Sequence, residues 1–303
     1  TFTGYGRYDV SLKVLYDDSR EANYTEKDVV RVLPTTAYVD LDGGHIWPFE
    51  TLLNAATNFQ EAIEAVSATE AAPGTVSIQP GTYGEANGLD ASHDYMLLLA
   101  RPVRLVGQGA TATDTVIDGN HARRLLRMLA EGAAVENLTL SRGANLMGVA
   151  AKGFGLEIGA GTVTGCIVTN GWSPDVANFA SPEAMVLQGG GVVSNTAICG
   201  NRTASTSPSN KSGATVQMTG GTMANCRIFD NIGRNPNGLV YLSGAGTCLI
   251  NSRVFGNTLK STRYPLKLSA GVTLAAGAQL VGCEITDNVC ETYSYSGAGG
   301  LNL

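Results

Sequence analysis

The sequence reads Asn195-Thr196-Ala197-Ile198-Cys199-Gly200-Asn201 and, 30 residues later, Asn225-Cys226-Arg227-Ile228-Phe229-Asp230-Asn231. Each segment is an alternating apolar–polar run between two asparagines, which is the pattern of a half-buried strand. The same start recurs along the chain at spacings of 28, 30, 30, 26 and 31 residues. Its other members are Asn137-Leu138-Thr139-Leu140, Gly165-Cys166-Ile167-Val168, Asn251-Ser252-Arg253-Val254 and Gly282-Cys283-Glu284-Ile285.

A second alternating strand precedes each of these segments by about ten residues. Its members are Leu126-Arg127-Met128, Leu156-Glu157-Ile158, Met185-Val186-Leu187, Val216-Gln217-Met218, Val240-Tyr241-Leu242 and Val272-Thr273-Leu274. One repeat has too little apolar surface to fold alone, so coils must stack and bury their inward residues on one another. The uneven period fits neither a propeller blade nor a leucine-rich repeat. The sequence therefore predicts an all-β fold, a right-handed parallel β-helix.

The segment before the repeats predicts a cap for this β-helix. Thr57-Asn58-Phe59-Gln60 reads as a capping box, and a helix over 58–70 would place its apolar residues on one face. Pro73-Gly74 is expected to end the helix, and Val76–Tyr83 to begin the first coil. An amphipathic helix at this place would cover the open edge of the β-helix.

Residues 38–83 resemble the start of bacterial right-handed β-helix repeat proteins, a pectin-lyase-like superfold. The matching residues are Tyr38-Val39-Asp40, Pro48-Phe49-Glu50-Thr51, Ala55-Ala56, Gln60, Ala62-Ile63 and Pro80-Gly81-Thr82-Tyr83. The later coils are similar to the repeats of polymorphic outer-membrane proteins, as in Gly189-Gly190-Gly191-Val192 followed by Ile198-Cys199-Gly200-Asn201. Phe229-Asp230-Asn231 and Phe255-Gly256-Asn257 are each one residue short of that pattern.

Residues 1–33 resemble the end of a PKD domain, an immunoglobulin-like sandwich. Gly6–Val14 matches its penultimate strand and Asp28–Val32 its last strand, with Asp17-Asp18 in the turn between them. We expect three parts: the PKD tail over 1–34, the start of the β-helix with its capping helix over 35–74, and the β-helix itself over 75–303. Gly300–Leu303 falls in the middle of a repeat, so we expect the natural chain to continue beyond it.

Composition narrows the classes of partner. The net charge of −6 and the pI near 5.1 argue against nucleic acid, which requires a basic surface. The sequence has no run of about 18 apolar residues that would span a membrane. The resemblances imply an extracellular or bacterial cell-surface location. No spacing typical of a zinc site occurs, and we expect neither metal nor cofactor.

Two sets of repeated residues have a structural interpretation. Cys166, Cys226 and Cys283 share the inward column two coils apart, about 9–10 Å, which is beyond disulfide reach, so we expect buried thiols. Pairing among Cys199, Cys248 and Cys290 stays open. The asparagine columns are expected at left-handed corners and in stacks of amides between coils. Their members are Asn137, Asn195, Asn225 and Asn251, and Asn201, Asn231, Asn257 and Asn288.

No catalytic constellation stands out. Hydrolases of this fold need paired carboxylates, and lyases need a basic residue beside acids or a cation. The one dense polar cluster comprises Asp114, Asp118, His121, Arg123, Arg124 and Arg127. It offers a candidate lyase base, but we interpret it as a solvated connection between coils.

One outward column carries the functional hypothesis. If Leu126 and Met128 point inward, Arg127 points outward, and stacking aligns it with its equivalents in later coils. We call this the outward stripe: Arg127, Glu157, Val186, Gln217, Tyr241, Thr273 and Asn302. Arg127, Glu157, Gln217 and Tyr241 are the candidate ligand-binding residues, for a polysaccharide or cell-surface glycan. We predict a non-catalytic adhesion or glycan-contact module, with a polysaccharide lyase or glycoside hydrolase as the alternative and a structural stalk as the third reading.

Overall fold

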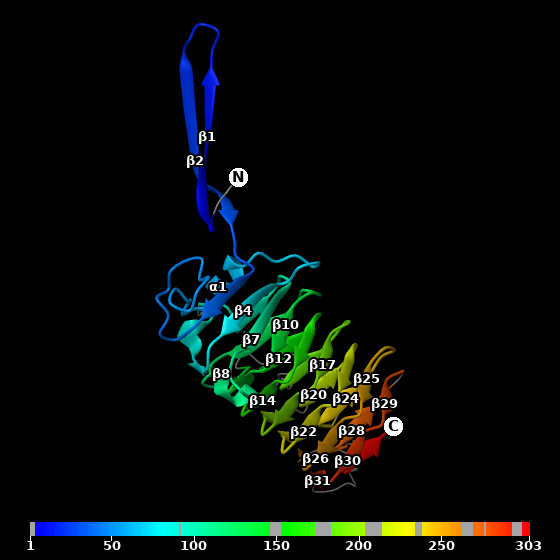
Figure 1. The fold of residues 1–303 in the computed structure, drawn as a ribbon. Coiled ribbons are helices and arrows are strands. Elements are labelled where there is room, and N and C mark those ends of the chain that lie inside the picture. Colours follow the sequence, from blue (N-terminus) through cyan, green and yellow to red (C-terminus); the bar gives the residue numbers. More distant parts are fainter. Residues whose placement is uncertain are drawn as a thin grey trace.

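The computed structural model describes residues 4–90, 92–145, 153–173, 183–203, 214–233, 238–261, 269–275, 277–292 and 299–303. In this part the chain is mostly β and forms a parallel β-solenoid, with an antiparallel hairpin at its N-terminal end (Figure 1). The strands of successive coils stack in register to make parallel sheets. This confirms the solenoid expected from the repeat.

Within the described residues, four parallel sheets, called sheets 1 to 4, run along the solenoid. Sheet 1 contains β3 (Thr36–Val39), β4 (Gly74–Ile78), β7 (Val103–Gly107), β10 (Ala134–Glu136), β13 (Thr162–Thr164), β17 (Val192–Ser194), β21 (Thr222–Ala224), β25 (Cys248–Ile250) and β29 (Gln279–Val281). Sheet 2 contains β5 (Gly81–Tyr83), β8 (Thr115–Asp118), β11 (Thr139–Ser141), β14 (Ile167–Thr169), β18 (Ala197–Cys199), β22 (Arg227–Phe229), β26 (Arg253–Phe255) and β30 (Glu284–Thr286).

The remaining two sheets complete each coil. Sheet 3 contains β6 (Tyr95–Leu99), β9 (Arg124–Met128), β12 (Leu156–Ile158), β16 (Met185–Leu187), β20 (Val216–Met218), β24 (Val240–Leu242), β28 (Val272–Leu274) and β32 (Leu301–Asn302). Sheet 4 is shorter and contains β15 (Trp172–Ser173), β19 (Arg202–Thr203), β23 (Ile232–Gly233), β27 (Thr258–Ser261) and β31 (Val289–Thr292).

The path from sheet 1 to sheet 4 has a constant length. In the five coils that begin at β13, β17, β21, β25 and β29, the sheet 2 strand starts five residues after the sheet 1 strand, and the sheet 4 strand starts five residues later again. The corner between sheets 1 and 2 is a single residue with a left-handed backbone. Asn195, Asn225 and Asn251 have φ of 49°, 54° and 46°, and Gly165 and Gly282 take the same place in their coils. The predicted corner role of these asparagines is confirmed.

The core is a set of columns that run along the solenoid axis. The predicted inward residues Leu140, Val168, Ile198, Ile228 and Val254 are paired strand to strand and at most 1% exposed. Ile285 continues this column and packs on the core, but it is only half-buried because β30 is the edge strand of sheet 2. The predicted register is therefore confirmed.

The inward cysteine column is a ladder of thiols and hydroxyls. Cys166 and Cys226 are each 1% exposed, and Thr196 and Ser252 occupy the alternate coils, also buried. Each of these side chains donates to the carbonyl two residues earlier in its own chain, as Cys226 does to Ala224 and Ser252 to Ile250. Burial raises the pKa of the Cys166 thiol to about 12 and that of Cys226 to about 11. All six cysteines are free thiols. The expected burial is confirmed for Cys166 and Cys226 and is wrong for Cys283, which is half-buried because it lies between the edge strands β29 and β30.

The helix is shorter than predicted. α1 spans Phe59–Ala65, and its N-cap is Asn58, whose side chain accepts from the N–H groups of Gln60 and Glu61. Val66 is already extended and Ser67 donates to the Pro34 carbonyl, so the helix ends well before Pro73-Gly74. The predicted apolar face, Phe59, Ala62, Ile63 and Val66, is buried. α1 packs against β3, β4 and β6 at the N-terminal end of the solenoid (Figure 1). Two short 3₁₀ helices, η1 (Glu85–Asn87) and η2 (Ala112–Asp114), lie in the early coils.

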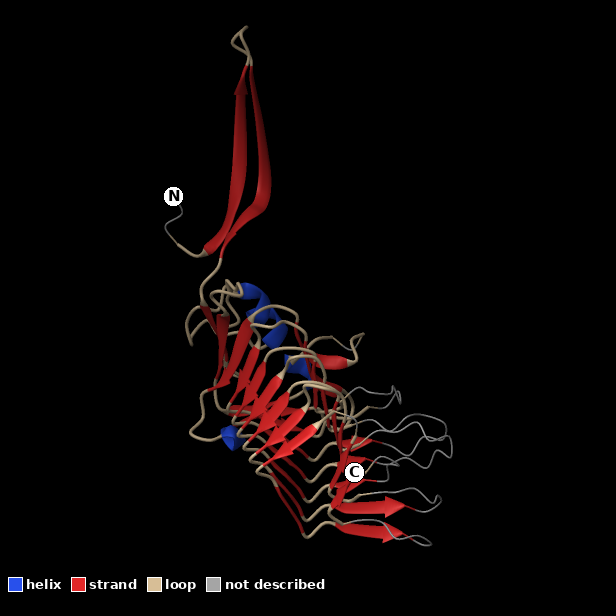
Figure 2. Cartoon of the chain, turned by 90° about the vertical axis from the view of Figure 1, so that its right-hand side faces the viewer, coloured by secondary structure: helices blue, strands red, loops and turns tan. Residues whose placement is uncertain are grey.

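The N-terminal hairpin projects away from the end of the solenoid where α1 lies (Figure 2). β1 (Gly6–Leu15) pairs antiparallel with β2 (Glu21–Val32), and Asp17-Asp18 lie in the turn as predicted. The second strand starts seven residues earlier than the predicted Asp28, because residues 21–27, which are mostly polar, extend it by backbone pairing with β1. Leu12 and Tyr24 oppose each other across the hairpin and are 60% and 63% exposed.

Candidate functional site

The outward stripe lies where the sequence placed it. Strand pairing aligns Arg127 with Glu157, Val186, Gln217, Tyr241, Thr273 and Asn302 on successive strands of sheet 3. The stripe is not uniformly open to solvent. Glu157 is 7% exposed and Val186 is fully buried, whereas Arg127, Gln217 and Tyr241 are half-buried. Of the four candidate residues, these last three therefore present surface.

The N-terminal part of the stripe is a charge network that spans three coils. Arg124, 3% exposed, donates to a carboxylate oxygen of Glu157 and, over 3.0 Å, to Asp94. The hydroxyl of Tyr95 donates to the same Glu157 oxygen over 3.0 Å, and its ring lies 3.9 Å from the Arg124 guanidinium carbon. Burial raises the pKa of Tyr95 to about 12, although the Arg124 charge opposes this. Glu157 is therefore occupied by groups of its own chain.

Arg127 adds a second cation to Glu157. Its Nε lies 3.0 Å from Oε1 of Glu157, which is an ion-pair distance, but the N–H does not point along a hydrogen bond. The Arg127 side chain is one-third exposed, and its guanidinium carbon is 5.4 Å from the Tyr95 ring centre. Both oxygens of the Glu157 carboxylate thus face a guanidinium group, Oε2 that of Arg124 and Oε1 that of Arg127.

The rest of the predicted polar cluster separates into independent contacts. Asp114 accepts from the N–H of Thr111 at the start of η2. Arg123 donates to the carbonyls of Leu89, Asp90, His93 and Tyr95, which fixes the loop between η1 and β6. The interpretation of the cluster as one solvated connection is wrong for Asp118 and Arg124, which are buried, and the six residues do not form one group. Arg124 and Arg127 meet at Glu157, whereas Asp114 is held within its own turn.

Asp118 is paired with an arginine that the sequence analysis did not associate with it. Nε and Nη2 of Arg142 both donate to the Asp118 carboxylate, from the next coil along sheet 2. Burial raises the pKa of Asp118, but these hydrogen bonds and the N–H of Asn120 outweigh burial and lower it overall. This ion pair therefore joins two successive coils.

An exposed aromatic side chain beside this pair was also missed. Trp172 on β15 is 41% exposed, and its ring meets His121 edge-on at 6.4 Å between centres. The sequence places Trp172 at the start of a variable connection, where no alternation reveals which way a side chain points. Asn170 and Gly171, which directly precede Trp172, indicate that a corner of the coil is near.

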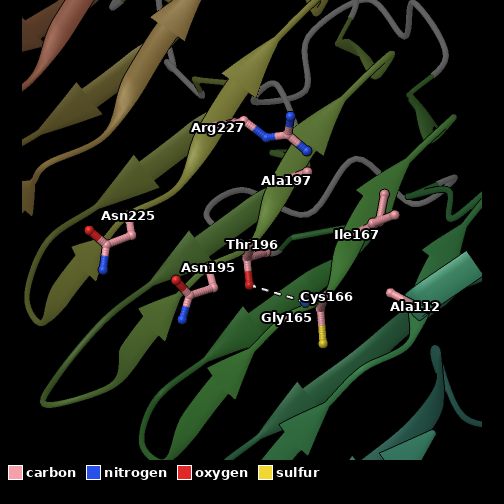
Figure 3. Close-up of a pocket in the computed structure, with 9 residues that line it drawn as sticks. All are labelled: Ala112, Gly165, Cys166, Ile167, Asn195, Thr196, Ala197, Asn225 and Arg227. Carbon is pink, nitrogen blue, oxygen red and sulfur yellow. Dashed lines mark hydrogen bonds between the residues drawn. The ribbon is translucent and has the colours of Figure 1, made fainter. Parts of the chain in front are cut away.

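The outer face of sheet 2 carries a second set of aligned side chains. The rings of Phe229 and Phe255 stack at 5.0 Å with 5° between their planes, and Arg227 and Arg253 lie over them. A hollow of about 250 Å³ opens beside Arg227 at the corner between sheets 1 and 2 (Figure 3). Among the described residues, no group of three or more His, Cys, Asp or Glu side chains is close enough to hold a metal ion.

Comparisons with known proteins show no family for this chain. No protein-family model matches the chain, and no curated protein matches it. The crystal structure of Escherichia coli YbhC is similar at a TM-score of 0.37 and 12% identity, over 88% of this chain and 77% of YbhC. Likeness at that level bears on neither substrate nor activity. No described helix has the length and apolarity needed to cross a membrane. The chain is a parallel β-solenoid whose outer faces carry aligned polar and aromatic side chains.

Proposed function

We propose that the chain is a non-catalytic, extracellular or cell-surface module that contacts a glycan along the outward stripe. The observation that carries this proposal is the strand pairing that sets Gln217 and Tyr241 side by side on β20 and β24, on a rigid sheet. Amide and phenol side chains on neighbouring strands suit an extended polyhydroxylated chain, because each offers a hydrogen-bonding tip on a fixed base. Arg127, at the N-terminal end of the stripe, adds a positively charged group.

We also propose a more specific fold class than a parallel β-solenoid. We infer a right-handed, pectin-lyase-like β-helix over 75–303, similar to the repeats of polymorphic outer-membrane proteins. Residues 35–74 start it, and residues 1–34 are the tail of a PKD domain. The two antiparallel strands β1 and β2, with apolar side chains exposed on one face, support a sandwich origin for the hairpin, since a two-stranded hairpin is marginally stable by itself.

The non-catalytic part rests on how the carboxylates are used. Glu157 is held by Arg124 and Arg127, Asp118 by Arg142, Glu136 by Arg104 and Glu284 by Arg253. A glycosidase needs one carboxyl group that gives up a proton and a second that faces the substrate, both within a few ångströms of the bond. The ion pairs favour a structural role for these acids. The alternatives are a polysaccharide lyase or glycoside hydrolase, and a stalk.

A glycan array probed with the full chain tests the proposal, alongside ultraviolet detection of unsaturated uronate products. We expect retention of at least one glycan and no product. Tyr241→Ala should weaken that binding by on the order of 1–2 kcal/mol, as for loss of one aromatic contact. Tyr24→Ala, which changes an exposed tyrosine of the hairpin, is the matched control. Product release that Arg127→Ala abolishes would show an enzyme, and no retained glycan would leave the stalk.

A further inference from the structure

The hollow on sheet 2 is built by a step in side-chain size. Ile167, Ala197 and Arg227 are the first residues of three successive strands and lie next to one another in one outward column. The short Ala197 between two long side chains leaves the space, and Ala112 of η2 borders it on the side of the earlier coils (Figure 3). The full lining is Ala112, Gly165, Cys166, Ile167, Asn195, Thr196, Ala197, Asn225 and Arg227.

The cation at this hollow has no carboxylate partner in the described part of the chain. Arg227 is exposed and its guanidinium lies 5.7 Å from the Phe229 ring centre. The next arginine in the same column, Arg253, lies over Phe255 in the same way but donates with Nε and Nη2 to both oxygens of Glu284. The two arginines thus share a ring contact and differ in whether their charge is already paired.

Two amides stand at the opposite border of the hollow. Asn195 and Asn225 are the exposed corner residues of successive coils, with left-handed backbones that fix where their side chains start. Neither side chain makes a hydrogen bond within the described residues, in contrast to Asn137, which donates to two carbonyls. Each amide therefore has a donor and an acceptor to offer, next to the apolar floor of Ile167 and Ala197.

We propose that this hollow binds a single acidic sugar residue. The guanidinium of Arg227 pairs with the carboxylate, because its planar fork matches that group. The corner amides exchange hydrogen bonds with ring hydroxyls, and a C–H face of the ring covers Ala197. A volume of about 250 Å³ is close to the lower end of small-molecule sites, about 300 Å³, and fits one ring and not a polymer segment. The site lies on a different sheet from the outward stripe and does not depend on it.

Titration of the full chain with sodium glucuronate, followed by calorimetry or by NMR, tests the site. Glucose and inorganic sulfate are the comparison probes, because glucose lacks the carboxylate and sulfate lacks the ring. We expect saturable glucuronate binding that is at least tenfold tighter than that of either comparison probe. An oligosaccharide that ends in glucuronate should bind as well as the free acid if the natural source is a chain end, and not at all if it is the free sugar acid.

Three variants separate the site from general charge. Arg227→Gln should lower glucuronate affinity at least tenfold, whereas Arg253→Gln should leave it within twofold, since Arg253 is occupied by Glu284. Ala197→Leu should fill the hollow and abolish binding, and Asn195→Gly, which suits the left-handed corner, removes one amide without that change in bulk. Equal losses in the two arginine variants, or unchanged binding when Asn195→Gly and a folded Ala197→Leu are both tested, would overturn the proposal. Tyr241→Ala should leave glucuronate binding unchanged, so the proposals for this site and for the outward stripe are tested independently.

Discussion

Oδ1 of Asn231 accepts two hydrogen bonds from Asn201, one from the backbone N–H and one from Nδ2, each 3.1 Å long. Asn257 and Asn288 continue the same arrangement, and all four amides are at most 9% exposed. Replacing Asn231 removes the acceptor of the buried Asn201 N–H, and a buried polar group left unsatisfied costs about 1–3 kcal/mol. Nδ2 of Asn201 keeps the carbonyls of Val168 and Cys199, but the hydrogen bonds that the Asn231 side chain itself donates are also lost. We therefore expect Asn231→Ala to lower the free energy of unfolding by about 2–4 kcal/mol, measured by urea denaturation.

Asn225→Gly is the control for that substitution. Asn225 is an exposed asparagine one strand away, and glycine accepts its left-handed backbone, so the change should stay within about 0.5 kcal/mol. A loss below about 1 kcal/mol for Asn231→Ala would show that the amide ladder contributes little to stability.

Thiol labelling should separate Cys166 and Cys226 from Cys283. Cys166 and Cys226 are buried and their raised pKa values keep them as thiols, whereas a thiolate is the reactive form. We expect both to resist an alkylating reagent at pH 8 in the native protein while the half-buried Cys283 reacts, with all six reacting in denaturant. Peptide mapping by mass spectrometry identifies the labelled sites. Rapid native labelling of Cys166 or Cys226 would contradict the inward column.

Cys226→Ser should be nearly neutral, because Ser252 in the next coil makes the same hydrogen bond to the carbonyl two residues earlier. Cys226→Leu adds volume to a packed column and should cost about 1–3 kcal/mol. Thermal unfolding of the two variants checks this. The same cost for serine and leucine would mean that side-chain size does not matter in this column.

Glu157 is expected to stabilise the fold more than any exposed acid. Glu157→Ala leaves Arg124, 3% exposed, without one of its two carboxylate partners, and breaking a buried pair costs about 3–5 kcal/mol. Glu136→Ala removes the partner of Arg104, which is 44% exposed, and should cost below about 1 kcal/mol. Urea denaturation measures both. Equal effects would indicate that the network around Tyr95 is open to water.

The Asp118–Arg142 pair should make stability depend on pH in the acid range. The pKa of Asp118 is lower in the folded chain than its ordinary value of 3.8, so the carboxylate stabilises the fold above that value and loses the effect as pH falls further. The difference in melting temperature between wild type and Asp118→Asn should be largest near pH 6 and disappear toward pH 2. Arg142→Gln should show the same convergence, and a constant difference across this range would contradict it.

Alternation within short strands made the solenoid predictable. Leu140, Val168, Ile198, Ile228 and Val254 lie at equivalent positions of the repeat, and equivalent positions must stack when coils are parallel. The outward stripe followed from the same parity. The cysteine and asparagine columns were predictable too, since polar side chains at one repeat position meet the same backbone groups in every coil and have few hydrogen-bond partners to choose from.

Contacts between residues that do not share a repeat position could not be predicted. Arg124 and Glu157 differ in their positions within sheet 3 strands, and Asp94 comes from a loop, so no periodicity connects them. The hollow beside Arg227 depends on the size of Ala197 relative to its neighbours in other coils. Alternation gives the direction of a side chain, whereas these features depend on how far each side chain reaches.

In the five coils with a sheet 4 strand, the two five-residue steps from sheet 1 to sheet 4 form a segment of fixed length, and the segment that follows varies in length. The segment of fixed length carries the left-handed corner and the amide ladder, so one inserted residue there would move the later strands of that coil out of register with the neighbouring coils. The variable segment has 8 to 14 residues, counted from the start of a sheet 4 strand to the start of the next sheet 3 strand. The number of residues between a sheet 4 strand and the next sheet 3 strand can therefore change from coil to coil without altering the register of sheets 1 and 2.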